Sequence, residues 1–84
     1  YTGRFKKDYK LAVKRNYNIS LIDALIRNLI NEHPLDARHK DHALSGEYEG
    51  CRECHIKPDW LLIYQIGNGI IVFGRTGTHS DLFE

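Results

Sequence analysis

The chain has 84 residues, of which 42% are hydrophobic, and a formal net charge of +1 from twelve basic and eleven acidic side chains. This length fits one small domain, expected to span residues 1–84, with a thin core, because a domain of this size buries only about 60% of its unfolded surface. No apolar stretch approaches the roughly 20 residues of a membrane span, and no secretory signal is visible.

The basic side chains are concentrated at the start of the chain, where a helix is predicted. Residues 1–15 carry six basic groups against one acidic group, and the rest of the chain is net negative. Lys6, Lys10 and Lys14 recur every four residues and therefore share one helical face. Such a face can bind phosphates, although an ordinary solvated face is the more common explanation on charge alone. The opposite stripe, expected to pack on a sheet, consists of Phe5, Tyr9 and Val13.

A second helix is expected after a break at residues 16–18. Ser20 is its predicted N-cap, and Pro34 is predicted to end it. An apolar stripe at helical spacing runs from Leu21 to Ile30. Residues 34–47 are mostly polar and are predicted to form a loop.

The second half of the chain has the pattern of an antiparallel sheet. Strands are predicted at about 49–57, 61–66 and 70–73. Pro58-Asp59 separates the first two, and Gly67-Asn68-Gly69 is a hairpin signal between the last two. Two helices followed by this sheet predict an α+β fold.

Three histidines lie in segments of the chain that are rich in polar side chains. His42 lies in the predicted loop, His55 near the end of a predicted strand, and His79 in the tail after Gly77. Histidine titrates near neutral pH, so a cluster of histidines can both accept and donate protons in one site. Cleavage of nucleic acid without a metal needs such groups. Judged from composition alone, a histidine on a strand, such as His55, is more often a packed or hydrogen-bonded residue, and one in a tail, such as His79, is more often merely exposed.

The two cysteines raise the question of a cofactor. Cys51-x-x-Cys54-His55 matches the attachment pattern of c-type haem, but the match is short, lies in a predicted strand, and has no Met to accompany it as an axial ligand. A zinc site is disfavoured because no second cysteine pair is present. A disulfide suits the spacing poorly, since residues i and i+3 of a strand point to opposite faces. We therefore expect no cofactor and no metal.

Two segments carry a resemblance to a known family. DHALSGEYEGCRECHIKPDWLLIYQI, which begins at Asp41, and RTGTHSDLF, which begins at Arg75, resemble the YafQ subgroup of the RelE/ParE superfamily of bacterial toxins. The resemblance implies a ribosome-dependent mRNA endonuclease that is neutralised by an antitoxin. It also implies two helices packed on a twisted antiparallel sheet, with a first strand that is expected to be trimmed from the start of this chain.

The resemblance further implies which residues act. Attack of a 2′-hydroxyl on the adjacent phosphate needs a base, an acid and groups that support the phosphorane charge, but no metal. The residues expected to be catalytic are His42, His55, Asp59 and His79. The residues expected to bind substrate by stacking on a base are Trp60 and Phe83. Arg75 is added from its position at the end of the last strand, where it is expected to support the phosphate charge. His33 and His39 match no motif and are expected at the surface.

The same resemblance implies the partners. These are a cognate antitoxin, in an expected heterotetramer that reaches operator DNA only through the antitoxin, and the ribosome with translated mRNA in the bacterial cytoplasm. We expect Lys6, Lys10 and Lys14 to contact ribosomal RNA. One alternative is a ParE-like inhibitor of a protein such as gyrase, which would typically lack the histidine cluster. Another is a free-standing ribonuclease, which the near-neutral charge disfavours because such an enzyme must hold its own substrate.

Overall fold

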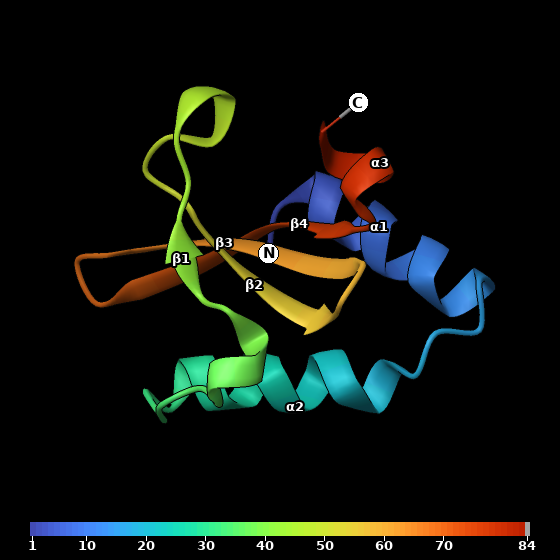
Figure 1. Ribbon diagram of the computed structural model, residues 1–84, viewed down its shortest axis with the longest axis horizontal. Helices are drawn as coiled ribbons and strands as arrows, with labels where there is room; N and C mark the ends of the chain where they lie inside the picture. The colour runs from blue at the N-terminus through green and yellow to red at the C-terminus, as the bar shows by residue number, and fades with distance from the viewer. Residues whose placement is uncertain (84) are drawn as a thin grey trace.

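The computed structural model describes residues 1–83, so the expected domain end at Glu84 lies outside the described residues. Two N-terminal helices precede a four-stranded antiparallel sheet whose strands follow one another in chain order (Figure 1). The predicted α+β class is therefore confirmed. The elements are α1 (Gly3–Lys14), α2 (Ile19–Ile30), the 3₁₀ turn η1 (Ala37–His39), β1 (His42–Ala43), the 3₁₀ turn η2 (Gly46–Tyr48), β2 (Arg52–Lys57), β3 (Trp60–Gly67), β4 (Ile70–Gly77) and α3 (His79–Phe83).

The first helix is attached to the sheet at its N-cap. The Thr2 hydroxyl accepts a hydrogen bond from the Phe5 amide and donates one to the Gly74 carbonyl on β4. Phe5 and Ala12 are buried, but Val13 is 50% exposed, so the prediction that Val13 packs on the sheet was wrong. At 3.6 residues per turn, Ala12 returns almost to the direction of Phe5, whereas Val13 points roughly 80° away.

The second helix begins earlier and ends earlier than predicted. Asn18, not Ser20, is the N-cap, and its side-chain oxygen accepts hydrogen bonds from the Ser20 amide and hydroxyl. The helix ends at Ile30, and Glu32 takes a left-handed conformation with φ of 57° before Pro34 is reached.

The segment predicted as a loop contains three short ordered elements. The turns η1 and η2 flank β1, a two-residue strand that pairs with β2 so that His42 lies opposite Glu53. Asp41 anchors this segment, because its carboxylate accepts hydrogen bonds from Arg52 Nε at 3.0 Å and from the Tyr64 hydroxyl at 2.7 Å. A strand this short has no alternation that a sequence pattern could display.

The predicted hairpin between β3 and β4 is confirmed. Asn68 and Gly69 both have positive φ, as the turn type favoured in two-residue hairpins requires. β4 continues four residues beyond its predicted end at Phe73, as far as Gly77, which lies opposite Leu61. This extension carries the chain back to the turn between β2 and β3.

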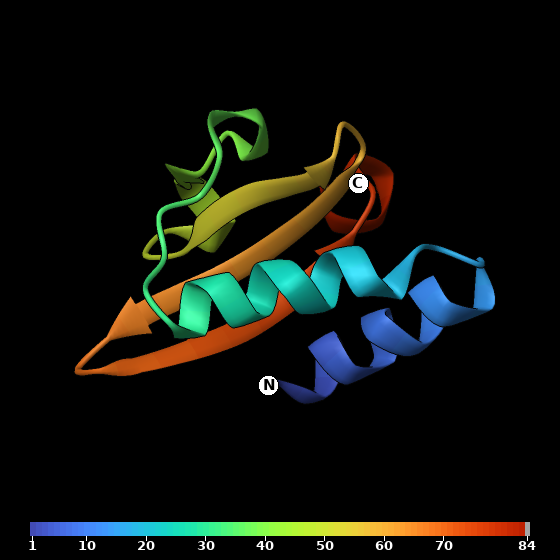
Figure 2. The ribbon, with the colours of Figure 1, turned by 90° about the horizontal axis from the view of Figure 1, so that it is seen from below.

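The sheet has two unequal faces. Helices α1 and α2 cover one face, and the larger core lies beneath them (Figure 2). The other face holds a smaller cluster of Leu61, Ile63 and Leu82, with Leu44, Tyr48 and Cys51 packed against it. Side chains two residues apart on β2 point to the same face, so Glu53 and His55 lie on this second face. No helix within residues 1–83 is long and apolar enough to cross a membrane.

Candidate active site

The register of the last two strands builds the site. Because Gly77 lies opposite Leu61, the residues that follow β4 come to lie beside the turn that precedes β3. Thr78 and Asp81 then start α3 with reciprocal hydrogen bonds, in which each backbone amide donates to the other side chain, at 2.9 and 3.1 Å. A Cβ atom at Gly77 would lie 2.9 Å from the Asp81 side chain, so this approach requires glycine.

The three histidines predicted to be catalytic form a row on the second face of the sheet. The ring centroids of His42 and His55 are 6.4 Å apart, and those of His55 and His79 are 5.8 Å apart. The row comes from three separate elements, β1, β2 and α3. The ring of Phe83 continues it, with its centroid 6.4 Å from that of His79.

Asp59 holds His79 at two points. The Asp59 Oδ1 atom accepts a hydrogen bond from the His79 amide at 2.9 Å and lies 2.6 Å from Nδ1 of the ring. Both contacts hold the pKa of the Asp59 carboxyl below its usual value, and the hydrogen bond from the His79 amide has the larger effect. An ionised carboxylate can only accept, so the ring proton lies on Nδ1, and Nε2 is left free for chemistry.

His42 is oriented by a neutral group. Its Nδ1 atom lies 2.6 Å from the Lys40 carbonyl, an acceptor that fixes the ring proton on Nδ1. The residue is exposed, and its Nε2 atom therefore has access to solvent or to a ligand. All four side chains predicted to be catalytic are thus brought to one region of the surface.

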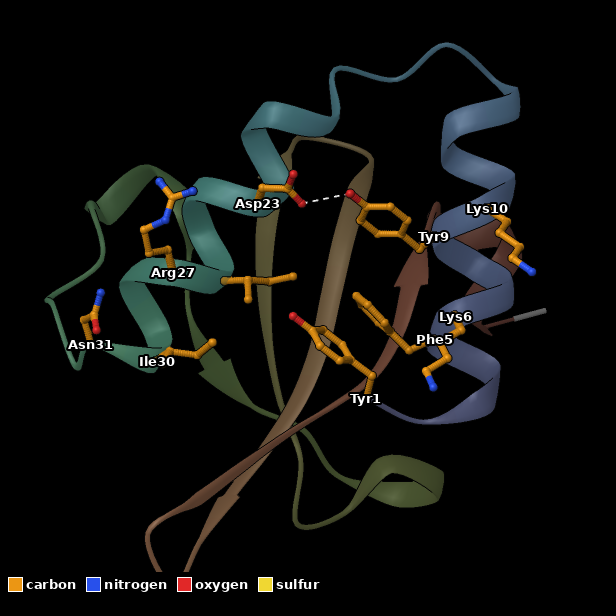
Figure 3. Close-up of a pocket in the computed structure, with 10 residues that line it drawn as sticks. Tyr1, Phe5, Lys6, Tyr9, Lys10, Asp23, Arg27, Ile30 and Asn31 are labelled. Atoms are coloured by element: carbon orange, nitrogen blue, oxygen red, sulfur yellow. Dashed lines mark hydrogen bonds between the residues drawn. The ribbon is translucent and has the colours of Figure 1, made fainter.

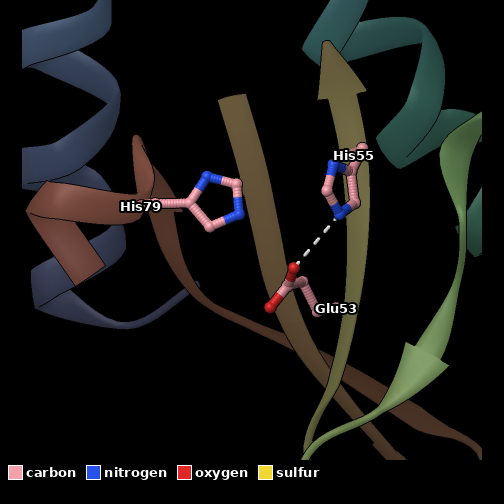
Figure 4. A group of neighbouring side chains, drawn as sticks. All are labelled: Glu53, His55 and His79. Atoms are coloured by element: carbon pink, nitrogen blue, oxygen red, sulfur yellow. Dashed lines mark ion pairs between the residues drawn. The ribbon is translucent and has the colours of Figure 1, made fainter. Parts of the chain in front are cut away.

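Glu53 is a member of this site that the sequence reasoning missed. It is only 5% exposed, and its Oε1 atom lies 3.3 Å from Nε2 of His55 (Figure 4). Ligand atoms of Glu53, His55 and His79 all lie within 4.8 Å of one another, so these three residues could hold a metal ion. The i, i+2 spacing of Glu53 and His55 on a strand was the available signal, since it places both on one face.

His39 was also missed, because it was predicted to be a surface residue. The side chain is half-buried, and Nδ1 lies 2.6 Å from the backbone carbonyl of His55. This contact ties η1 to β2 at the residue that carries the central ring of the row. His33 is exposed, as predicted.

Trp60 does not offer a face for stacking on a base. It is 4% exposed, its Nε1–H donates to the Thr76 hydroxyl at 3.0 Å, and its ring packs against that of Tyr17. The prediction that Trp60 binds substrate is therefore corrected: its side chain belongs to the larger core, directly after the turn that carries Asp59. Phe83, in contrast, is exposed and packs edge-on against Tyr48, which leaves ring surface accessible.

Arg75 is already paired inside the protein. Its Nε and Nη2 atoms donate to the two oxygens of Asp8 at 2.7 and 3.3 Å, and its Nη1 atom lies 3.5 Å from the Tyr48 hydroxyl. The Asp8 hydrogen bond is the main cause that raises the pKa of the Arg75 guanidinium. This pair joins α1 to β4, and phosphate binding by Arg75 stays a prediction.

The predicted ribosome-contacting lysines lie on the exposed side of α1. Lys6 and Lys10 also border a groove of about 630 Å³ between α1 and α2 (Figure 3). Its floor and walls are largely aromatic and aliphatic, with Asp23 hydrogen-bonded to the Tyr9 hydroxyl at 2.9 Å. The apolar residues that line it are Tyr1, Phe5, Tyr9, Ile26 and Ile30.

Comparison with known proteins gives consistent matches over the full chain. The family model of the bacterial toxin of type II toxin–antitoxin systems, YafQ, matches residues 1–84. The mRNA interferase toxin YafQ of Escherichia coli K12 is 45% identical over 99% of this chain and 91% of its own length.

Solved structures agree in fold. The toxin of the E. coli DinJ–YafQ complex is 45% identical, with a TM-score of 0.94 over 100% of this chain and 94% of that chain. A metal-bound toxin from Helicobacter pylori is 42% identical, with a TM-score of 0.90 over 98% of this chain and 93% of that chain.

The fold, together with the family match over residues 1–84, identifies the class of protein: a small α+β bacterial toxin of a type II toxin–antitoxin system. Within this class, the chain belongs to the YafQ family.

Proposed function

We propose that this chain cleaves mRNA on the translating ribosome by metal-independent acid–base catalysis, and that a cognate antitoxin neutralises it. The chain is a YafQ-family toxin, and the relative at 45% identity is an mRNA interferase, so the enzyme class is endoribonuclease. The observation that carries the mechanism is the row of three histidines with carboxylates at two of them. A ribosome-bound substrate places the reaction in the bacterial cytoplasm.

His55 and His79 are suited to the two proton transfers. One ring accepts the proton of the attacking 2′-hydroxyl, and the other protonates the leaving 5′-oxygen. Their ring centroids are 5.8 Å apart, so both rings can reach groups of a single phosphodiester. The carboxylates of Glu53 and Asp59 stabilise an imidazolium when either ring is protonated. His42 lies at the end of the row and can donate to or accept from the substrate, and Phe83 can stack on an exposed base.

The openness of the site supports a requirement for the ribosome. The side chains of His79 and Asp59 are 54% and 66% exposed, and the net charge of the chain is only +1. An open, weakly charged surface holds RNA poorly by itself, so another particle must present the substrate. Lys6, Lys10 and Lys14 would meet ribosomal RNA phosphates from α1.

The groove between α1 and α2 is a candidate contact for the antitoxin. It is apolar at its centre, and its cations are Lys6, Lys10 and Arg27 against the single carboxylate of Asp23. An antitoxin segment with apolar and acidic side chains would complement it. The E. coli relative is described in complex with DinJ. We propose a heterotetramer here, in which the antitoxin supplies the contact with operator DNA.

The alternative of a gyrase inhibitor is less well supported, because such a function gives no reason for three converging histidines.

Cleavage assays on ribosomes programmed with a defined mRNA test the proposal. Wild-type protein should cut within the codon in the vacant decoding site, and naked RNA should stay intact. His79→Ala should still cosediment with ribosomes but not cut, whereas replacing Lys6, Lys10 and Lys14 by Glu should weaken cosedimentation. Equal cutting of naked RNA would refute the ribosome requirement.

The acid and the base can be separated chemically. A substrate with a bridging 5′-sulfur at the cleaved bond has a leaving group that needs no proton. It should restore cleavage to the variant that lacks the acid, and not to the variant that lacks the base. His55→Ala and His79→Ala should therefore respond differently. If neither variant is rescued, proton donation by these residues is not part of the reaction.

A further inference from the structure

We infer that the cavity beside the Asp59–His79 pair holds one base of the mRNA next to the cleaved bond, and that the side chains of Asn16 and Asn18 read this base. The cavity has a volume of about 550 Å³ and is lined by the connection between α1 and α2 and by the turn between β2 and β3. Binding of a base is a property of the cavity itself, whereas a role of that base in cleavage rests on the proposed function.

The cavity adjoins the site of the proposed proton transfer. Asp59 and Thr78 line it, and they flank His79: Thr78 precedes it in the chain, and Asp59 Oδ1 lies 2.6 Å from Nδ1 of its ring. Within residues 1–83, the recorded hydrogen bonds of Asp59 both go to Oδ1, so Oδ2 is available to a ligand. An mRNA strand that passes His79 needs a place for the base on each side of the cleaved bond. Phe83 offers a ring to one base, and the cavity can take the other.

The lining suits a neutral planar group better than a phosphate. Tyr17 is half-buried, and its ring packs against that of Trp60 with centroids 4.9 Å apart, so a firm aromatic surface borders the cavity. Among the described residues that line it, Lys57 and Asp59 carry the charges, and these cancel. The volume lies within the range of about 300–1,000 Å³ in which proteins bind small ligands. RNA-binding proteins hold unstacked bases against such aromatic side chains.

The two asparagines provide the polar groups that reading a base requires. Asn18 Oδ1 is occupied as the N-cap of α2, since it accepts hydrogen bonds from the Ser20 amide and hydroxyl at 3.2 and 2.5 Å. Its NH₂ group is thereby held in place with both donors available. Asn16 is exposed, and its side chain makes no recorded hydrogen bond within residues 1–83, so it offers a donor and an acceptor. Bases are read in RNA by hydrogen bonds to edges on which donors and acceptors alternate.

Two substitutions remove these amides and keep the backbone as it is. Asn18→Ser retains a capping oxygen for α2 but loses the NH₂ group. Asn16 has a φ of 60°, a conformation that glycine adopts freely, so Asn16→Gly removes the side chain without strain. Asn28→Ser, at an exposed asparagine of α2 outside the cavity, is the matched control. All three variants should unfold in urea close to the wild-type midpoint.

Binding is tested on the protein alone by NMR, which detects weak complexes. Protein labelled with ¹⁵N is titrated with four RNA trinucleotides, one for each base, whose 2′-hydroxyls are methylated so that they cannot be cleaved. The side-chain amide signals of Asn16 and Asn18 should shift, most strongly for one of the four, and those of Asn28 should not. Asn16→Gly and Asn18→Ser should each weaken this binding by roughly 2- to 10-fold. Shifts that spare both asparagines for all four trinucleotides would overturn the base site.

Reading of the base is tested on ribosomes programmed with messages that differ in one base of the codon at a time. Wild type should prefer one base at one position beside the cut by about fivefold or more. Asn16→Gly and Asn18→Ser should each reduce this preference, leave the other positions unchanged and cosediment normally, and Asn28→Ser should match wild type. An unchanged preference, or an equal loss of cleavage on every message, would overturn the reading.

The two tests separate this inference from the proposed function. Normal cleavage of ribosome-bound mRNA without shifts at Asn16 and Asn18 would remove the base site and leave the proposed function intact. Shifts at both asparagines in a wild-type protein that cuts no ribosome-bound mRNA would refute the proposed function, and reading of the base during cleavage with it, while the base site itself would stand.

Discussion

Arg15 at the end of α1 and Asp81 on α3 form a two-point ion pair across 66 residues of sequence. Arg15 Nη1 donates to Asp81 Oδ2 at 2.7 Å, and Nη2 donates to Oδ1 at 3.2 Å. Asp81 also accepts a hydrogen bond from the Thr78 amide at the start of α3. Since α3 has only five residues and carries both His79 and Phe83, its position depends on such tertiary contacts.

We predict that Arg15→Ala reduces mRNA cleavage, because α3 loses its attachment to α1. A displacement of the His79 ring by about 1 Å could lower the single-turnover rate by up to about 10²-fold. Arg15→Lys should recover part of the rate, since it keeps the charge but not the two-point geometry. Arg4→Ala, an exposed arginine on the same helix, is the matched control. Wild-type cleavage by Arg15→Ala would show that the ion pair does not position the site.

The same ion pair predicts a change in acid stability. The Arg15 hydrogen bond, followed by that from the Thr78 amide, lowers the pKa of Asp81 from 3.8 to about 2. Because the folded-state pKa is depressed, this stabilisation is present above pH 3.8 and is lost as the pH falls towards 2. Asp81→Asn should therefore flatten the decline of unfolding free energy over this range, measured by urea titration. Glu47→Gln, an exposed carboxylate on η2, should not. Identical pH profiles of Asp81→Asn and wild type would contradict the linkage.

Asp59→Asn should impair catalysis far more than stability. The amide can donate as well as accept, so the His79 ring is no longer held with its proton on Nδ1. We expect cleavage to fall by about 10²- to 10⁴-fold, the range found when a catalytic histidine loses its base or its orienting carboxylate. The free energy of unfolding should change little, since both side chains are exposed. Ribosome cosedimentation serves as the control for binding. An active Asp59→Asn enzyme would remove Asp59 from the mechanism.

Trp60→Phe should have the opposite profile. It removes the buried hydrogen bond to the Thr76 hydroxyl, which keeps its own bond to the Leu61 carbonyl at 2.7 Å. A loss of about 1–2 kcal/mol in unfolding free energy is expected, measured in urea. Cleavage by the folded fraction should stay within a few-fold of wild type. If stability is unchanged but cleavage is abolished, the indole contacts the RNA after all.

Much of the fold follows from patterns within short stretches of sequence. The two amphipathic helices, the hairpin at Asn68-Gly69 and the α+β class depend on local spacing and were confirmed. The N-cap at Asn18 and the exposure of Val13 were mispredicted, because neighbouring residues offered equally good alternatives.

The contacts that complete the site depend on residues far apart in the chain. Glu53 approaches His79 only because the register of β3 and β4 returns the tail to β2. The Arg15–Asp81 pair, the burial of Trp60 and the contact of His39 with β2 have the same origin. The spacing of residues within a short stretch does not predict which distant residues come into contact. The resemblance therefore indicated residues of the site, but not the residues that contact them.

Mapping of mRNA 5′ ends in cells after brief induction tests the central claim most directly. The wild-type protein should produce new 5′ ends inside translated codons, and these ends should disappear from a reporter message whose start codon has been removed. His79→Ala, expressed to the same level, should produce none. New ends in the untranslated reporter, or equal cutting by His79→Ala, would contradict ribosome-dependent cleavage by the histidine site.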